Sequence, residues 1–180
     1  DHLCLIYQKG TKTPVIDAEK IRKTFQIGRK RLFDDDPRFG IVVLSEIASR
    51  ALSPAVNDPG TAIDVMGSLH RVFSTWQKMK SERKDDSPAF DRIEVPGLEI
   101  DVMMEDAFAS IGRDGSKYVE VITRLQNTLI AISKMDDMDF RNAAQIQAIK
   151  SLDRIKMDMT YPSDLDRIES IFNSHFDYTT

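Results

Sequence analysis

The chain lacks the residues that most metal sites and disulfide-stabilised folds depend on. Its 180 residues include one cysteine, Cys4, and three histidines, which lie far apart. A single cysteine cannot form an internal disulfide, and a reducing compartment is the mild inference. No cysteine and histidine spacing matches a zinc site either. We therefore expect neither a bound metal nor a cofactor.

Long hydrophobic runs are missing as well. A membrane-spanning helix needs about 20 consecutive apolar residues, and no stretch approaches that length. The first residues also lack the basic start and apolar core of a signal peptide. The chain nevertheless begins at Asp1, inside a segment that reads as a strand. We expect residues 1–180 to form a single soluble domain, with further protein upstream.

Charge and motif content restrict the function classes. The chain has 25 basic and 29 acidic residues, a net charge of −4. This charge gives no overall electrostatic attraction to nucleic acid, so we predict no nucleic-acid partner. The chain contains no glycine-rich phosphate loop and no nucleophile elbow. A non-enzymatic role is therefore favoured, although dispersed carboxylates leave an enzyme open.

Hydrophobic periodicity predicts a mainly α fold, a bundle of about seven helices with a minor β element. The two short strands are expected near residues 2–8 and 92–95. Asp36-Pro37 and Asp58-Pro59 each combine an N-cap residue with a proline at the first helical position, so each predicts a helix start. The expected helices begin near 17, 36, 58, 99, 119, 139 and 163, and no sequence repeat relates them.

Three details of these helices are specific predictions. The first helix is expected to extend about sixteen residues from Asp17, because apolar residues continue at helical spacing. The apolar faces of the next two helices include Ile47 and Val72. Ser163 and Asp166 resemble a capping box for the last helix.

The segment 50–62 is the candidate site. It combines Arg50, Ser53, Asn57, Asp58 and Thr61 with two prolines between two predicted helices. The free amides of the second helix and Arg50 would hold an anion, with the other polar side chains adding hydrogen bonds. The alternative is a structural joint in which Arg50 pairs with Asp58 and Asn57 stabilises the turn. The residues alone leave both interpretations open.

A second candidate surface is the basic face of the first helix. Residues 17–31 contain six basic and two acidic side chains. Lys23, Arg29 and Lys30 are the residues we expect at a membrane surface with anionic lipid headgroups. A solvated face with no partner explains the same pattern.

The motifs of the first third resemble those of DUF2254, a family of uncharacterised bacterial predicted membrane proteins. The resemblance rests on Asp36-Pro37-Arg38-Phe39-Gly40, on Glu46-Ile47-Ala48-Ser49-Arg50-Ala51-Leu52-Ser53-Pro54, and on Asn57-Asp58-Pro59-Gly60-Thr61-Ala62. It implies that transmembrane helices precede this chain, which would be their C-terminal soluble portion. The chain departs from the family pattern at Val56 and Gly60.

The resemblance implies a membrane protein whose domain lies on the cytoplasmic side, with its own transmembrane region as a partner. A homo-oligomer is also compatible with it. The first functional hypothesis is a non-enzymatic domain for assembly, regulation or ligand sensing. The second is an anion- or nucleotide-binding module centred on residues 50–62.

Overall fold

The computed structural model describes residues 4–6, 17–25, 28–29, 33, 36–82 and 92–176. This part of the chain contains seven helices and one two-stranded sheet, which confirms the predicted mainly α fold with a minor β element. The elements are β1 (Leu5–Ile6), α1 (Ala18–Thr24), α2 (Pro37–Ala51), α3 (Pro59–Glu82), β2 (Ile93–Glu94), α4 (Ile100–Asp114), α5 (Val119–Ser133), α6 (Met138–Asp158) and α7 (Pro162–Asn173).

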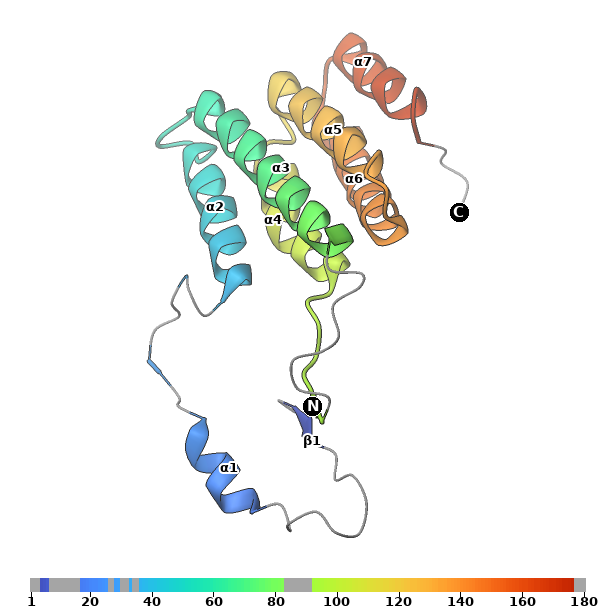
Figure 1. Ribbon diagram of the computed structural model, residues 1–180. Coiled ribbons are helices and arrows are strands. Elements are labelled where there is room, and N and C mark those ends of the chain that lie inside the picture. Colours follow the sequence, from blue (N-terminus) through green and yellow to red (C-terminus); the bar gives the residue numbers. More distant parts are fainter. Residues whose placement is uncertain are drawn as a thin grey trace.

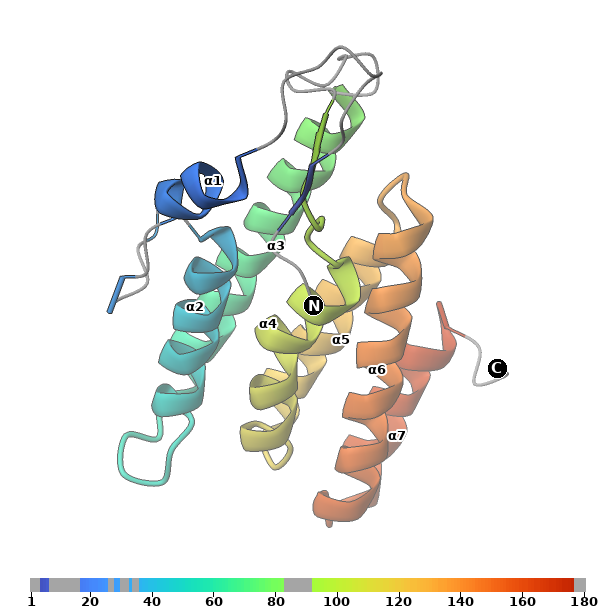
Figure 2. The same ribbon diagram turned by 90° about the horizontal axis from the view of Figure 1, so that it is seen from below.

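Helices α2 to α7 form a two-layered array (Figure 1). In Figure 2, α2, α4 and α6 lie side by side in front, and α3, α5 and α7 lie behind them. Consecutive helices therefore alternate between the layers, as in stacked helical hairpins. The sequence shows no repeat, so this regularity is a property of the packing alone.

Aromatic side chains join the helices at the centre of the array. The ring of Phe73 in α3 lies 6.0 Å from Phe108 in α4 and 6.2 Å from Phe140 in α6. Trp76 packs against Phe140 with its ring edge-on, at 5.7 Å. The three phenylalanines are almost fully buried, so they anchor three helices from both layers to each other.

The sheet is a minimal antiparallel ribbon. Leu5 pairs with Glu94, and Ile6 pairs with Ile93. This pairing confirms the two predicted strands. Among the described residues, no helix is both long enough and apolar enough to cross a membrane.

Helix starts follow the sequence closely where an Asp-Pro pair is present. The Asp36 carboxylate accepts a hydrogen bond from the Phe39 amide at 3.1 Å, with Pro37 in the first turn of α2. The capping box of α7 is wrong, because Tyr161 occupies the N-cap without a side-chain bond. Ser163 already lies inside that helix.

The prediction for the first helix is also wrong in length. Helix α1 has seven residues and ends at Thr24, since the backbone of the next residue, Phe25, is extended. None of its residues is buried, so no packing offsets the cost of a longer helix. Ile47 and Val72, placed on buried faces from the sequence, are 45% and 40% exposed, because the neighbouring elements leave these two positions largely uncovered.

Candidate functional site

The motif 50–62 forms a tight joint between α2 and α3. The Asp58 amide donates to the Ala51 carbonyl at 2.8 Å, which closes the loop across its ends. The Asn57 amide donates to the Ser53 carbonyl at 2.8 Å. Asn57 has a φ of 51°, a left-handed conformation that asparagine tolerates better than most residues. The sequence order of the motif is therefore explained by the path of the backbone.

Asp58 starts α3. Its carboxylate accepts one hydrogen bond from the Thr61 amide at 3.1 Å and another from the Thr61 hydroxyl at 2.6 Å. These bonds lower the pKa of Asp58. The carboxylate thus already places negative charge at the positive end of α3, where an anion would otherwise bind.

A residue outside the motif completes the joint. The Tyr118 hydroxyl donates to the Asn57 side-chain oxygen at 2.7 Å, which links the α2–α3 loop to the start of α5. Sequence reasoning missed Tyr118. No local pattern marks it, because the two residues are 61 positions apart.

Arg50 and Ser53 do not converge on Asp58. Arg50 is exposed and forms no ion pair with Asp58, so the predicted pairing of these two residues is wrong. The Ser53 hydroxyl donates to the Arg50 carbonyl at 2.7 Å. Of the five predicted site residues, Asp58 and Thr61 are bonded to each other, and Asn57 turns toward Tyr118.

A polar pocket of about 510 Å³ lies beside the joint. Ser53 is the one predicted site residue in its lining. Asp114 accepts a hydrogen bond from Arg113 at 2.7 Å, which lowers the pKa of Asp114, and Ser116 donates to Asp158 at 2.6 Å. The remaining lining residues are Ser49, Leu52, Pro54, Lys117 and Tyr118. Two cations and two carboxylates balance in this lining, which gives no net attraction for an anion.

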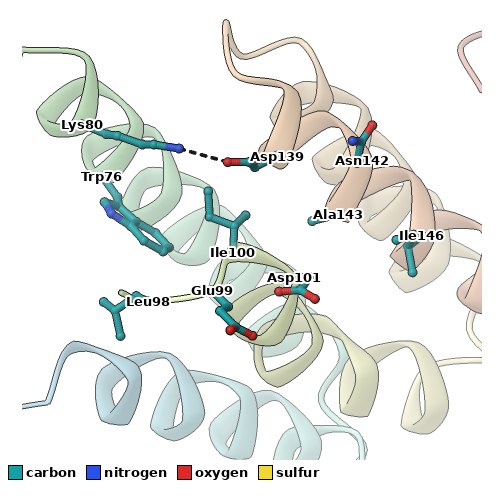
Figure 3. A pocket seen from close by; sticks show the side chains of 10 residues that line it. All are labelled: Trp76, Lys80, Leu98, Glu99, Ile100, Asp101, Asp139, Asn142, Ala143 and Ile146. Atoms are coloured by element: carbon teal, nitrogen blue, oxygen red, sulfur yellow. Dashed lines mark hydrogen bonds and ion pairs between the residues drawn. The ribbon is translucent and has the colours of Figure 1, made fainter. Parts of the chain in front are cut away.

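A larger groove, of about 740 Å³, lies where α3 ends, at the end of the array opposite the joint (Figure 1). Figure 3 shows the side chains that line it. It is formed where the end of α3, the start of α4 and the start of α6 meet. Its apolar side chains are Trp76, Leu98, Ile100, Ala143 and Ile146. Leu98 and Ile146 are 47% exposed each, so the groove presents apolar surface to solvent.

The charged side chains at the rim of this groove differ in whether they form ion pairs. The Lys80 ammonium lies 2.7 Å from Asp137 and 3.2 Å from Asp139, and the bond to Asp137 raises the pKa of Lys80. Glu99 and Asp101 form no ion pair with a described residue, and both are exposed. The groove therefore combines an apolar floor with two unpaired carboxylates, an arrangement that favours a cationic, partly apolar ligand.

The predicted membrane-surface residues lie elsewhere. Lys23 and Arg29 are exposed, and Lys23 pairs with Glu19 at 3.2 Å. Lys30 lies outside the described residues. Within those residues, no three histidine, cysteine, aspartate or glutamate side chains are grouped closely enough to hold a metal ion.

Comparison with known proteins identifies relatives without a known activity. The chain is 35% identical over 113 residues to the uncharacterized protein Rv1290c of Mycobacterium tuberculosis and to the uncharacterized protein Mb1321c of Mycobacterium bovis. These matches cover 60% of this chain but 21% of each relative, so the chain spans about a fifth of their length. No solved structure matches the chain significantly.

The family of predicted membrane proteins designated DUF2254 matches residues 1–131, which include the joint, the sheet and helices α1 to α4. The match extends well beyond the motifs of residues 36–62, and it includes both strands and the first part of the two-layered array. The chain therefore belongs to the DUF2254 family of predicted membrane proteins.

Proposed function

We propose that this chain is a non-enzymatic helical domain of a membrane protein, with a role in assembly, regulation or ligand sensing. The observation that carries the proposal is the internal bonding of the joint. Asp58 caps α3 through Thr61, Asn57 binds Tyr118, and Ser53 binds a backbone carbonyl. Side chains used in this way build a rigid support between two hairpins and leave few groups free for chemistry.

The groove of Figure 3 is the surface that would receive a ligand in such a domain. Its apolar floor and the unpaired carboxylates of Glu99 and Asp101 match a basic amphipathic helix in both polarity and charge. We infer that its occupant is a basic amphipathic segment of the same membrane protein. Binding of this kind would connect the domain to the remaining part of the protein.

The groove contains its own reporter, because Trp76 is the single tryptophan of the chain. Titration with a synthetic amphipathic helix of lysine and leucine should shift the fluorescence of Trp76. The double variant Glu99→Gln/Asp101→Asn should weaken that shift. Glu46→Gln/Glu120→Gln, which removes the same charge from exposed helix positions elsewhere, should not. Equal binding by both variants would contradict electrostatic recognition in the groove.

The non-enzymatic part of the proposal has a separate test. Hydrolytic or transferase turnover by the chain that disappears in Asp58→Ala, while circular dichroism shows the helices intact, would overturn it. Turnover unaffected by that substitution and by Arg50→Ala would point to a contaminating activity.

A second candidate function is anion or nucleotide binding at the joint, and the exposed Arg50 favours it. Arg50 has no ion-pair partner among the described residues, and Ser53, Asn57 and Thr61 lie on the following loop and helix start. Under this alternative, a phosphate-bearing ligand raises the melting temperature of the wild type and not of Arg50→Gln. No change with pyrophosphate or nucleoside triphosphates would remove it.

We further propose that the domain lies on the cytoplasmic side of the membrane, as the lone cysteine suggests. Cys4 is a free thiol and partly exposed. In intact cells that produce the full-length protein, a membrane-impermeant maleimide should therefore leave Cys4 unmodified. Labelling of Cys4 without permeabilisation would place the domain on the outer side.

A further inference from the structure

The least integrated part of the described structure is the region around α1. In Figure 1, α1 and β1 lie beyond the same end of the helical array. Helix α1 buries none of its residues, unlike the long helices of the array. We define the basic segment as the exposed side chains Lys20, Arg22, Lys23, Phe25, Arg29 and Phe33.

The basic segment contrasts in charge with the remainder of the chain. Residues 17–31 carry six basic and two acidic side chains, a net charge of +4, so the other residues carry −8 within the chain's total of −4. Lys20 pairs with Asp17 at 3.7 Å and Lys23 pairs with Glu19 at 3.2 Å, both at the exposed surface. Arg22 and Arg29 form no ion pair with a described residue. Two guanidinium groups are therefore available for an anionic partner.

Two phenylalanines add an apolar component to the same segment. Phe25 is 48% exposed and Phe33 is 61% exposed, although Phe33 also stacks on Phe39 at 4.8 Å. Exposed aromatic rings in the same stretch of sequence as arginine and lysine are typical of segments that lie in the headgroup region of a bilayer. Neither ring belongs to the buried core, so a partner surface would remove apolar area from water without disturbing the array.

We propose that the basic segment docks on the anionic headgroups of a bilayer, with Arg22 and Arg29 binding phosphate groups and Phe25 and Phe33 entering the interface. Charge complementarity identifies the partner, because an anionic surface attracts this segment and repels the acidic remainder of the chain. Membership of a family of predicted membrane proteins supports a bilayer as that surface. The docking would fix which end of the array faces the bilayer.

The test measures binding of the 180-residue chain to vesicles of phosphatidylglycerol and phosphatidylcholine by co-sedimentation. Each basic residue near an anionic surface changes the partition coefficient about fivefold, so Arg22→Gln/Arg29→Gln should weaken binding about thirtyfold. The matched control is Arg124→Gln/Arg167→Gln, which removes the same charge from exposed positions of α5 and α7 and should leave binding nearly unchanged. Phe25→Ser/Phe33→Ser should weaken binding at high salt, where headgroup attraction is screened.

An equal loss of vesicle binding in Arg22→Gln/Arg29→Gln and in Arg124→Gln/Arg167→Gln would overturn the proposal, since net charge alone would then control binding. Equal binding to pure phosphatidylcholine would overturn it as well. Full competition by soluble glycerol phosphate would identify a free-anion site and contradict docking on a lipid surface. Circular dichroism of each variant should match the wild type, because the four arginines and both phenylalanines lie outside the buried core.

Discussion

The bond between Tyr118 and Asn57 gives the sharpest test of the joint. Replacing Tyr118 with phenylalanine removes the hydroxyl at 2.7 Å from the Asn57 oxygen and leaves the backbone bonds of the α5 start in place. A hydrogen bond of this kind contributes about 0.5–1.5 kcal/mol to stability. Because this bond is exposed, we expect Tyr118→Phe to cost about 0.5–1 kcal/mol. In a chain of this length that lowers the melting temperature by about 1–4 °C.

The partner substitution isolates the bond from other effects. Asn57→Gly keeps the left-handed backbone at φ 51° and removes the accepting oxygen. In the Asn57→Gly background, Tyr118→Phe should therefore cost almost nothing, and the two substitutions should show a coupling energy close to the cost of Tyr118→Phe alone. Urea denaturation followed by circular dichroism measures all four proteins of the cycle.

Tyr161→Phe is the matched control, because Tyr161 is 64% exposed at the start of α7 and its hydroxyl bonds to no described residue. Its free energy of unfolding should stay within about 0.5 kcal/mol of the wild type. Additive costs for Tyr118→Phe and Asn57→Gly would refute the reasoning. Packing of the helices alone would then hold the α2–α3 loop beside the start of α5.

Two further predictions concern the packing and the acid response of the chain. Gly115→Ala would place a methyl group 2.6 Å from Val121 and 2.7 Å from the Ile111 carbonyl, so we expect a loss of about 1–3 kcal/mol in urea denaturation. Partial burial lowers the pKa of His175 below its usual 6.5, so the unfolded chain binds more protons near that pH. The free energy of unfolding should therefore decrease as the pH falls below 6.5, and His175→Gln should remove this slope. A slope that persists in His175→Gln would assign it to other groups.

The sequence by itself determined the helical class, the positions of most helices and the two strands. Asp36-Pro37 and Asp58-Pro59 are local signals, since a capping carboxylate and a proline act on amides within the next few residues. The buried residues of α4 likewise recur at helical spacing, because a face buried along a whole helix leaves a regular pattern in the sequence. The family resemblance also came from contiguous motifs, and the match to residues 1–131 confirmed it.

Tertiary structure alone decided how the helices are layered and what surrounds each candidate residue. The length of α1 depended on whether another element covered it, which periodicity does not encode. The ion pair between Arg50 and Asp58 does not form, for a similar reason. Residues eight positions apart across a loop come into contact only if the backbone of the loop brings their side chains together. The role of Tyr118 in the joint and the groove around Trp76 both depend on contacts between helices that are distant in the sequence. Local sequence specifies caps and faces, whereas sites formed between helices depend on how those faces are finally paired.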